Sequence, residues 1–92
     1  MSKNVTIKNH DRFVQLGITI AALRKIRGFS QEKLAEKAGI SRSLLSAIEA
    51  PNIVRSFSLE VFFDLSDALE VDPADLIGAA IFPDNLIKKK KS

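Results

Sequence analysis

The sequence predicts an all-α domain of five helices, and two features of the chain carry that prediction. Apolar residues recur at helical spacing in the segments 11–27, 31–38, 42–50 and 59–69, as expected of helices with one buried face. Residues that favour helix starts precede the later segments and a last one at 74–80; they are Ser30, Ser41, Ser58 and the Asp72-Pro73 pair. At 92 residues the chain has room for one domain with one core.

The segment 31–50 is the centre of the predicted fold, because it indicates two short helices that meet at a sharp turn. Gly39 follows the last periodic position of the first helix, where a left-handed backbone most easily ends a helix. Ser41 then caps the second helix, and Ile40 fills the corner. Ala35 has to be small, because helices crossing at roughly 90–120° after a short turn leave no room for a larger side chain.

This pattern resembles the helix-turn-helix of the lambda-repressor-like, Cro-type (XRE family) DNA-binding domains. The residues that carry the resemblance are Leu34, Ala35, Ala38, Gly39, Ile40, Leu45 and Ile48. The flanking stretches LGITIAALRKIRGFSQ and SLEVFFDLSDALEVDPADLI match as well, so the resemblance covers residues 16–77. It implies a compact five-helix DNA-binding domain. It also implies a transcriptional regulator, expected to be a repressor, that binds a pseudo-palindromic operator in double-stranded DNA as a homodimer.

The resemblance further implies which residues read bases. The N-terminal part of the second helix of the motif would enter the major groove. The expected base-reading residues are Ser41, Arg42, Ser43, Ser46 and Ala47. Arg42 is the best candidate for a two-point contact to guanine, whereas Ala47, at a position often polar in the family, offers only a methyl contact. Leu44 is either an apolar reader or a residue at the edge of the core, and the second is favoured.

Other positions are implied to hold the phosphate backbone or the motif itself. The expected phosphate contacts are Gln31, Asn52, Arg55 and Arg24. The residues expected to maintain the motif are Ala35, Gly39, Ile40, Leu45, Ile48 and Glu49. Glu49 is also expected to form an ion pair with Arg24. Between residues 51 and 57 the chain departs from the family, with a loop about two residues longer whose Ile53, Val54 and Phe57 suggest that part of it is tucked against the domain.

The chain divides into an N-terminal arm at 1–10, the helix-turn-helix domain at 11–80 and a C-terminal tail at 81–92. The arm is either a short strand or a loose segment. The first helix is expected to start at about Asp11, with Asn9 or Asp11 as its cap. It is expected to bury a stripe formed by Phe13, Leu16, Ile20 and Leu23. A second stripe, Ile18, Ala22 and Ile26, is either buried or a partner surface, and burial is favoured. The apolar part of the tail, 81–87, and the last helix are candidates for a dimer contact, and the four lysines at 88–91 are expected to be disordered.

Charge and composition exclude several classes of protein. Residues 1–57 hold ten basic against four acidic side chains, whereas 58–80 hold six acidic and no basic ones, so a polyanion would be drawn to the helix-turn-helix side. The chain has no cysteine and one histidine, His10, which excludes a thiolate or histidine metal cluster. No cofactor and no enzymatic activity are expected. Because no membrane span or signal peptide is predicted, we expect a cytoplasmic, nucleoid-associated protein.

A different class of function stays open beside DNA binding. The same domain serves antitoxins and restriction-modification controllers, and an antitoxin acts mainly by binding a partner protein. The second apolar stripe, the longer loop and the segment 81–87 are the features that favour a toxin or other protein partner.

Overall fold

The computed structural model describes residues 2–53 and 55–81, and it shows five helices and no strand within them. The helices are α1 (Ser2–Ile26), α2 (Gln31–Ala38), α3 (Arg42–Glu49), α4 (Leu59–Leu69) and α5 (Pro73–Ile81). The predicted all-α fold is confirmed, and the last four helices agree with their predicted ranges to within a residue at either end.

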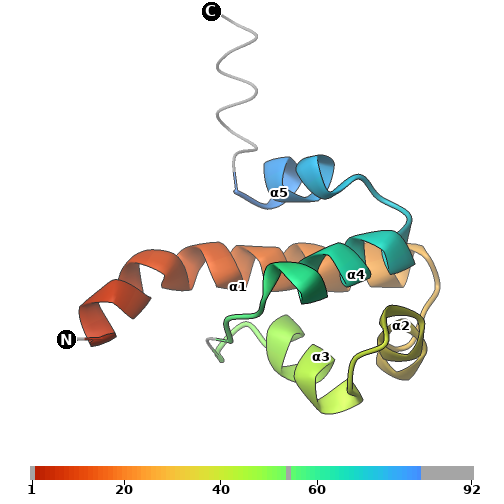
Figure 1. Ribbon diagram of the computed structural model, residues 1–92, viewed down its shortest axis with the longest axis horizontal. Coiled ribbons are helices and arrows are strands. Elements are labelled where there is room, and N and C mark those ends of the chain that lie inside the picture. The colour runs from red at the N-terminus through yellow and green to blue at the C-terminus, as the bar shows by residue number, and fades with distance from the viewer. Residues whose placement is uncertain (1, 54, 82–92) are drawn as a thin grey trace, which may run out of the picture.

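Helix α1 runs through the middle of the domain, with α5 on one side of it and α2 and α3 on the other (Figure 1). It packs against α5, α3 and α4, while α2 packs against α3 and α4. The fully buried side chains come from all five helices and include Ile20, Leu34, Leu45, Leu65, Leu69 and Leu76. One continuous core therefore holds the helix-turn-helix against α1 and α4. No helix in the described part of the chain is long and apolar enough to cross a membrane.

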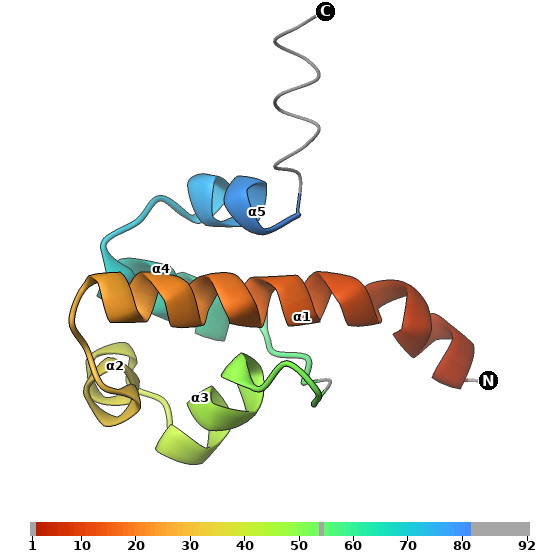
Figure 2. The ribbon, with the colours of Figure 1, turned by 180° about the vertical axis from the view of Figure 1, so that it is seen from behind.

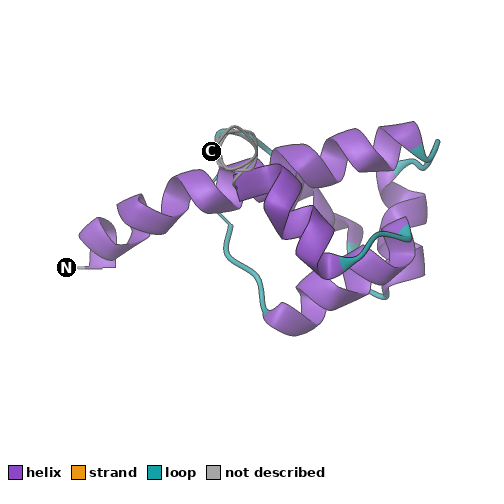
Figure 3. Ribbon diagram, turned by 90° about the horizontal axis from the view of Figure 1, so that it is seen from above, coloured by secondary structure: helices purple, strands orange, loops and turns teal. Residues whose placement is uncertain are grey.

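The start of α1 differs from the prediction. The helix begins at Ser2 rather than at about Asp11, and its first turns extend beyond the other helices (Figure 3). No proline or glycine interrupts residues 2–16, so nothing in that stretch stops the helix. Asn9 accepts a 3.4 Å hydrogen bond from Arg12 three residues later, as a neighbour on a helix rather than as a cap. Residues 2–10 are thus neither strand nor loose coil, and their division from the domain stays a prediction.

The two apolar stripes of α1 differ in burial. Leu16 and Ile20 are buried, with Leu23 packed against the core, and Phe13 makes an edge-to-face contact with Phe57 at 5.3 Å between ring centres. The expectation that the second stripe is buried is wrong. Its Ile18 and Ile26 are 44% and 74% exposed, and its Ala22 is exposed as well. Figure 2 shows that one side of α1 is not covered by another helix.

Serine hydroxyls start three of the helices as predicted. Ser30, Ser41 and Ser58 each accept a hydrogen bond of 3.0–3.1 Å from a backbone N–H in the first turn of α2, α3 and α4. Asp72 does the same for α5, accepting from the Ala74 N–H at 2.8 Å. These bonds satisfy amides that have no partner within their own helix.

Helix α4 ends at a non-glycine residue with a left-handed backbone. Glu70 has φ +59, in the left-handed region that favours glycine. Arg27 donates to the carbonyls of Leu69 and Glu70 at 2.8 and 3.2 Å. The arginine from the end of α1 therefore binds carbonyls left free at the end of α4.

Candidate nucleic-acid interface

The turn between α2 and α3 has the geometry that the sequence predicts. Gly39 lies in the left-handed region at φ +73, and the Ile40 N–H donates to the Ala35 carbonyl at 3.0 Å. The buried residues of the motif are Leu34, Ala35, Ala38, Leu45 and Ile48, and Ile40 is packed against them. The predicted helix-turn-helix is confirmed.

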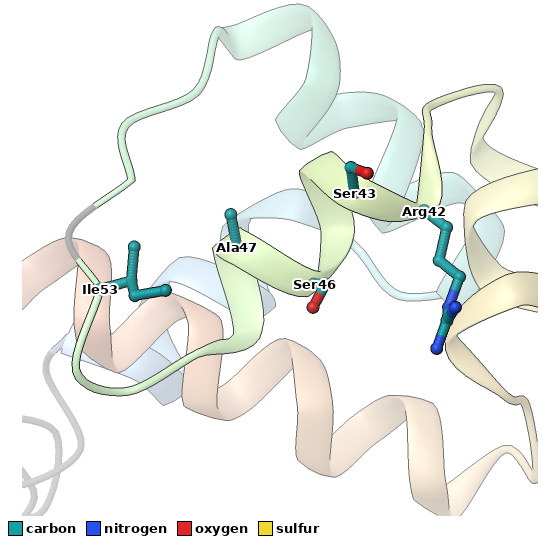
Figure 4. A pocket seen from close by; sticks show the side chains of 5 residues that line it. All are labelled: Arg42, Ser43, Ser46, Ala47 and Ile53. Atoms are coloured by element: carbon teal, nitrogen blue, oxygen red, sulfur yellow. The ribbon is translucent and has the colours of Figure 1, made fainter.

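One face of α3 is exposed and lines an open groove of about 490 Å³. Arg42, Ser43 and Ser46 are exposed and Ala47 is half-buried. Figure 4 shows Arg42 at one end of this face, the two serines in the middle and Ala47 beyond them. Ser41 is exposed as well, but its hydroxyl accepts the capping bond from Leu44. The structure thus brings together all five residues expected to read bases.

Leu44 does not belong to that face, because it packs against the core. Its assignment to the edge of the core is confirmed. The two faces of α3 are therefore distinct: one is held by the domain, and the other presents short polar side chains and one arginine to solvent.

A buried carboxylate connects α1, α2 and α3. Glu49, 8% exposed, accepts two hydrogen bonds from the Arg24 guanidinium, at 2.8 and 3.1 Å. It also accepts one from the Gln31 side-chain amide, at 2.9 Å, and Arg24 donates a further bond to the Phe29 carbonyl at 2.7 Å. The predicted ion pair is confirmed.

This network uses hydrogen-bond donors of two residues that are expected to contact phosphate. Arg24 is mostly engaged within the domain, with a side chain only 12% exposed. Gln31 uses one amide hydrogen on Glu49 and keeps its carbonyl oxygen and second hydrogen for another partner. The sequence does not reveal the link between Gln31 and Glu49, because the two residues are 18 positions apart and no spacing rule connects them.

The loop after α3 begins with a tight turn. The Ile53 N–H donates to the Ala50 carbonyl at 3.2 Å, and Asn52 and Arg55, two expected phosphate contacts, are exposed. Phe57 is packed against the core as expected. Ile53 is not tucked in: it is 51% exposed and lines the same groove as Arg42, because the turn returns the chain beside α3. Val54 lies outside the described residues.

The helix-turn-helix family model matches residues 20–76, which is more than half of the chain. The chain belongs to this family. The resemblance to Cro-type domains is thereby confirmed, and the residues matched begin in α1 and end in α5.

Two individual proteins are similar to this member of the family. An uncharacterized HTH-type transcriptional regulator, YazB of Bacillus subtilis (strain 168), is 38% identical over 60 residues, which cover 65% of this chain and 84% of YazB. The crystal structure of the restriction-modification controller protein C.AhdI from Aeromonas hydrophila is 34% identical, with a TM-score of 0.65. That match covers 70% of this chain and 94% of C.AhdI.

Charge is distributed unevenly over this helix-turn-helix domain. The exposed side chains of α3 include Arg42 and no acid, and Arg55 follows in the loop. On α2 the exposed Lys33 and Lys37 are offset by Glu32 and Glu36. In contrast, α4, α5 and the residues between them carry only acidic charge, on Glu60, Asp64, Asp67, Glu70, Asp72 and Asp75. The field therefore favours approach of a polyanion from the side of α3 and opposes it from α4 and α5.

Within the described residues no group of three or more histidine, aspartate or glutamate side chains could hold a metal ion.

Proposed function

We propose that this protein is a sequence-specific, double-stranded-DNA-binding transcriptional regulator that acts as a repressor and reads the major groove with α3 as a homodimer. The observation that carries the proposal is the division of α3 into two faces. Leu45, Ile48 and Glu49 fix the helix to the domain, while Arg42, Ser43 and Ser46 remain exposed on the other side. A helix of this kind, supported by a second helix across the backbone, fits the major groove.

In this proposal Arg42 supplies the strongest base contact. Its planar guanidinium matches the O6 and N7 acceptors of guanine, and each good two-point contact contributes about 1–3 kcal/mol of discrimination. Ser43 and Ser46 donate to or accept from neighbouring base edges, and the Ser41 hydroxyl hydrogen is available to a phosphate or a base. Ala47 contributes apolar contact alone.

The phosphate contacts set the orientation of α3. Gln31 stands at the N-terminus of α2, where free amides and the helix dipole favour an anion, and its bond to Glu49 holds the amide in place. Asn52 and Arg55 extend the contact past the end of α3. Arg24 acts mainly by holding Glu49 in place, and its remaining N–H groups lie near the DNA strand that Gln31 contacts.

A homodimer would place two copies of α3 in successive major grooves. Two half-sites then lie about 34–36 Å apart on one side of the duplex, and the operator is pseudo-palindromic. We place the dimer contact on α5, which exposes Ala74, Asp75 and Ala79. The segment 81–87, a second candidate, lies outside the described residues except for Ile81. Repression requires only that the bound dimer exclude the polymerase, and the proposal assigns the protein to the nucleoid of the cytoplasm.

Selection of bound duplexes from random DNA tests this function. We expect a pseudo-palindrome with a guanine in each half-site and half-site centres about 10 base pairs apart. A reporter with that site across its promoter should lose expression when the protein is made. Recovery of no enriched sequence, with binding equal on all duplexes, would contradict the proposal.

A second candidate function is that of a controller or antitoxin whose main partner is another protein. The likeness to C.AhdI favours the controller, and the exposed stripe Ile18, Ala22 and Ile26 offers apolar surface to a partner. Purification from the native host discriminates between the two, because a stoichiometric second protein supports this candidate.

A further inference from the structure

The groove on α3 has a polar part and an apolar part. Among the described residues, Arg42, Ser43 and Ser46 provide the polar side chains that line it, and Ala47 and Ile53 provide the apolar ones. Figure 4 shows Ile53 at the end of the groove opposite Arg42, with Ala47 as its nearest neighbour among the labelled residues. The two apolar side chains therefore lie toward the same end of the reading face.

The position of Ile53 is set by a tight turn that starts at the end of α3. The Ala50 N–H donates to the Ser46 carbonyl at 3.1 Å, and the Ile53 N–H donates to the Ala50 carbonyl at 3.2 Å. Pro51 takes the second position of this turn, where its fixed φ is favourable, and the φ of Asn52 is not positive, as in a type I turn. Ile53 is thus held next to α3 while half of its surface stays exposed.

The chemistry of the major groove limits what such a surface can bind. The edges of the bases present hydrogen-bond donors and acceptors there, and the one apolar group among them is the C5-methyl of a pyrimidine. The serine hydroxyl groups cannot form a hydrogen bond with a methyl group, whereas two aliphatic side chains can remove it from water.

We infer that Ala47 and Ile53 form a site for the C5-methyl group of a pyrimidine, either thymine or 5-methylcytosine. This inference rests on the proposed DNA-binding function and adds a specificity-determining residue from outside the helix-turn-helix. Residues 42 and 47 are about 7.5 Å apart along the helix axis at 1.5 Å per residue. The methyl group is therefore expected on a different base pair from the guanine that Arg42 contacts.

The test changes only the methyl group. In the duplex recovered by random selection, each thymine is replaced in turn by deoxyuridine and each cytosine by 5-methylcytosine, which leaves base pairing intact. For the wild-type protein, one thymine-to-uracil change should weaken binding about fourfold, the factor expected for one buried carbon. If that position is a cytosine, methylation should strengthen binding by the same factor.

The protein side of the test is Ile53→Ala. This variant should bind the methylated and unmethylated duplexes within about 1.5-fold of each other, because the methyl group has lost the larger of its two partners. Ile26→Ala makes the same change at another exposed isoleucine, on α1, and should keep the full methyl effect. Circular dichroism of both variants checks that they are folded.

Each outcome decides the inference. A fourfold thymine effect that Ile53→Ala removes supports it, and a further test with cytosine and 5-methylcytosine at that same position shows whether the site accepts both sources of the methyl group. A cognate duplex that no methyl change affects, or an effect that Ile53→Ala leaves unchanged, overturns the inference while the proposed function stands. If selection yields no preferred duplex, both are overturned. Loss of dimerisation in Ile53→Ala with an unchanged methyl effect would assign Ile53 to a protein contact instead.

Discussion

Gly17 lies where α1 crosses α3, and a Cβ added there would overlap the carbonyl oxygen of Ile48 and approach its carbonyl carbon to 3.1 Å. Both atoms belong to the backbone of α3, so the two helices would have to separate. We expect Gly17→Ala to lower the free energy of unfolding by about 2 kcal/mol or more, even though alanine favours the helix by about 1 kcal/mol.

Chemical denaturation measures this effect, with Gly28→Ala as the matched control. Nothing lies within 4 Å of a Cβ at Gly28, whose φ is +78, so this control should lose only the cost of a left-handed alanine, about 1 kcal/mol. A Gly17→Ala protein as stable as the wild type would show that the α1–α3 contact adjusts freely.

Glu49 is the residue on which three helices converge, and its loss should be costly. Glu49→Met leaves the Arg24 guanidinium, itself 12% exposed, without its carboxylate, and we expect a loss of about 3 kcal/mol in the free energy of unfolding. Arg24→Met should cost a similar amount for the same reason. The double variant should lose clearly less than the two single losses combined, because it leaves no unpaired charge. Additive losses in denaturation experiments would contradict this account of the pair.

At the scale of the element, the end of α4 offers a gain in stability. Glu70 has φ +59, which costs a non-glycine residue about 1 kcal/mol, and its carboxylate lies at the negative end of the helix dipole. Glu70→Gly should therefore raise the melting temperature. The bonds from Arg27 go to backbone carbonyls and are kept. The control is Asp67→Gly inside α4, which should lower the melting temperature; an equal loss in both variants would mean that Glu70 is not strained.

Sequence reasoning succeeds for the helices whose ends carry chemical signals. Ser30, Ser41 and Ser58 cap α2, α3 and α4, and each of these helices begins at the residue that follows. It fails at the start of α1, where Asn9 and Asp11 look like caps but the chain before them contains nothing that prevents a helix from continuing. It also fails for Ile18 and Ile26, because a periodic stripe shows that residues share a face without showing which face the other helices cover.

The candidate site, like the fold, is predicted only in part by the sequence. Arg42, Ser43 and Ser46 follow from the helix-turn-helix pattern, since that pattern determines which face of α3 is buried. Ile53 could not be placed in this way, because its position depends on the turn from Ala50 to Ile53 rather than on a periodicity. The available signal in the sequence is an apolar residue, Ile53, two positions after the proline that follows α3. Only the observed turn shows that this residue lies beside the reading face.

At the scale of the whole molecule, dimerisation is the property that the proposed function most requires. We expect a dimer in sedimentation equilibrium at micromolar concentration, at least with DNA present. If α5 forms the contact, Ala79→Glu should give monomers, because the charge would be desolvated at the interface. Ala22→Glu on the exposed stripe of α1 should leave the dimer intact. If Ala22→Glu gives monomers and Ala79→Glu does not, the contact lies on α1. A wild-type protein that stays monomeric and binds each DNA site as a single molecule would refute the dimer.

The central claim is that α3 reads bases with Arg42, and the affinity of Arg42→Ala for cognate and scrambled duplexes tests it most directly. Arg55→Ala removes the same charge at a proposed phosphate contact and serves as the control, with both variants measured across a salt series. Arg42→Ala should weaken cognate binding by about 1–3 kcal/mol and relax the preference at one base pair, with a much smaller loss on scrambled DNA. Arg55→Ala should weaken both duplexes alike and reduce the salt slope by about one unit. If Arg42→Ala lowers both affinities equally, Arg42 contacts the backbone and the assignment of the reading face is wrong.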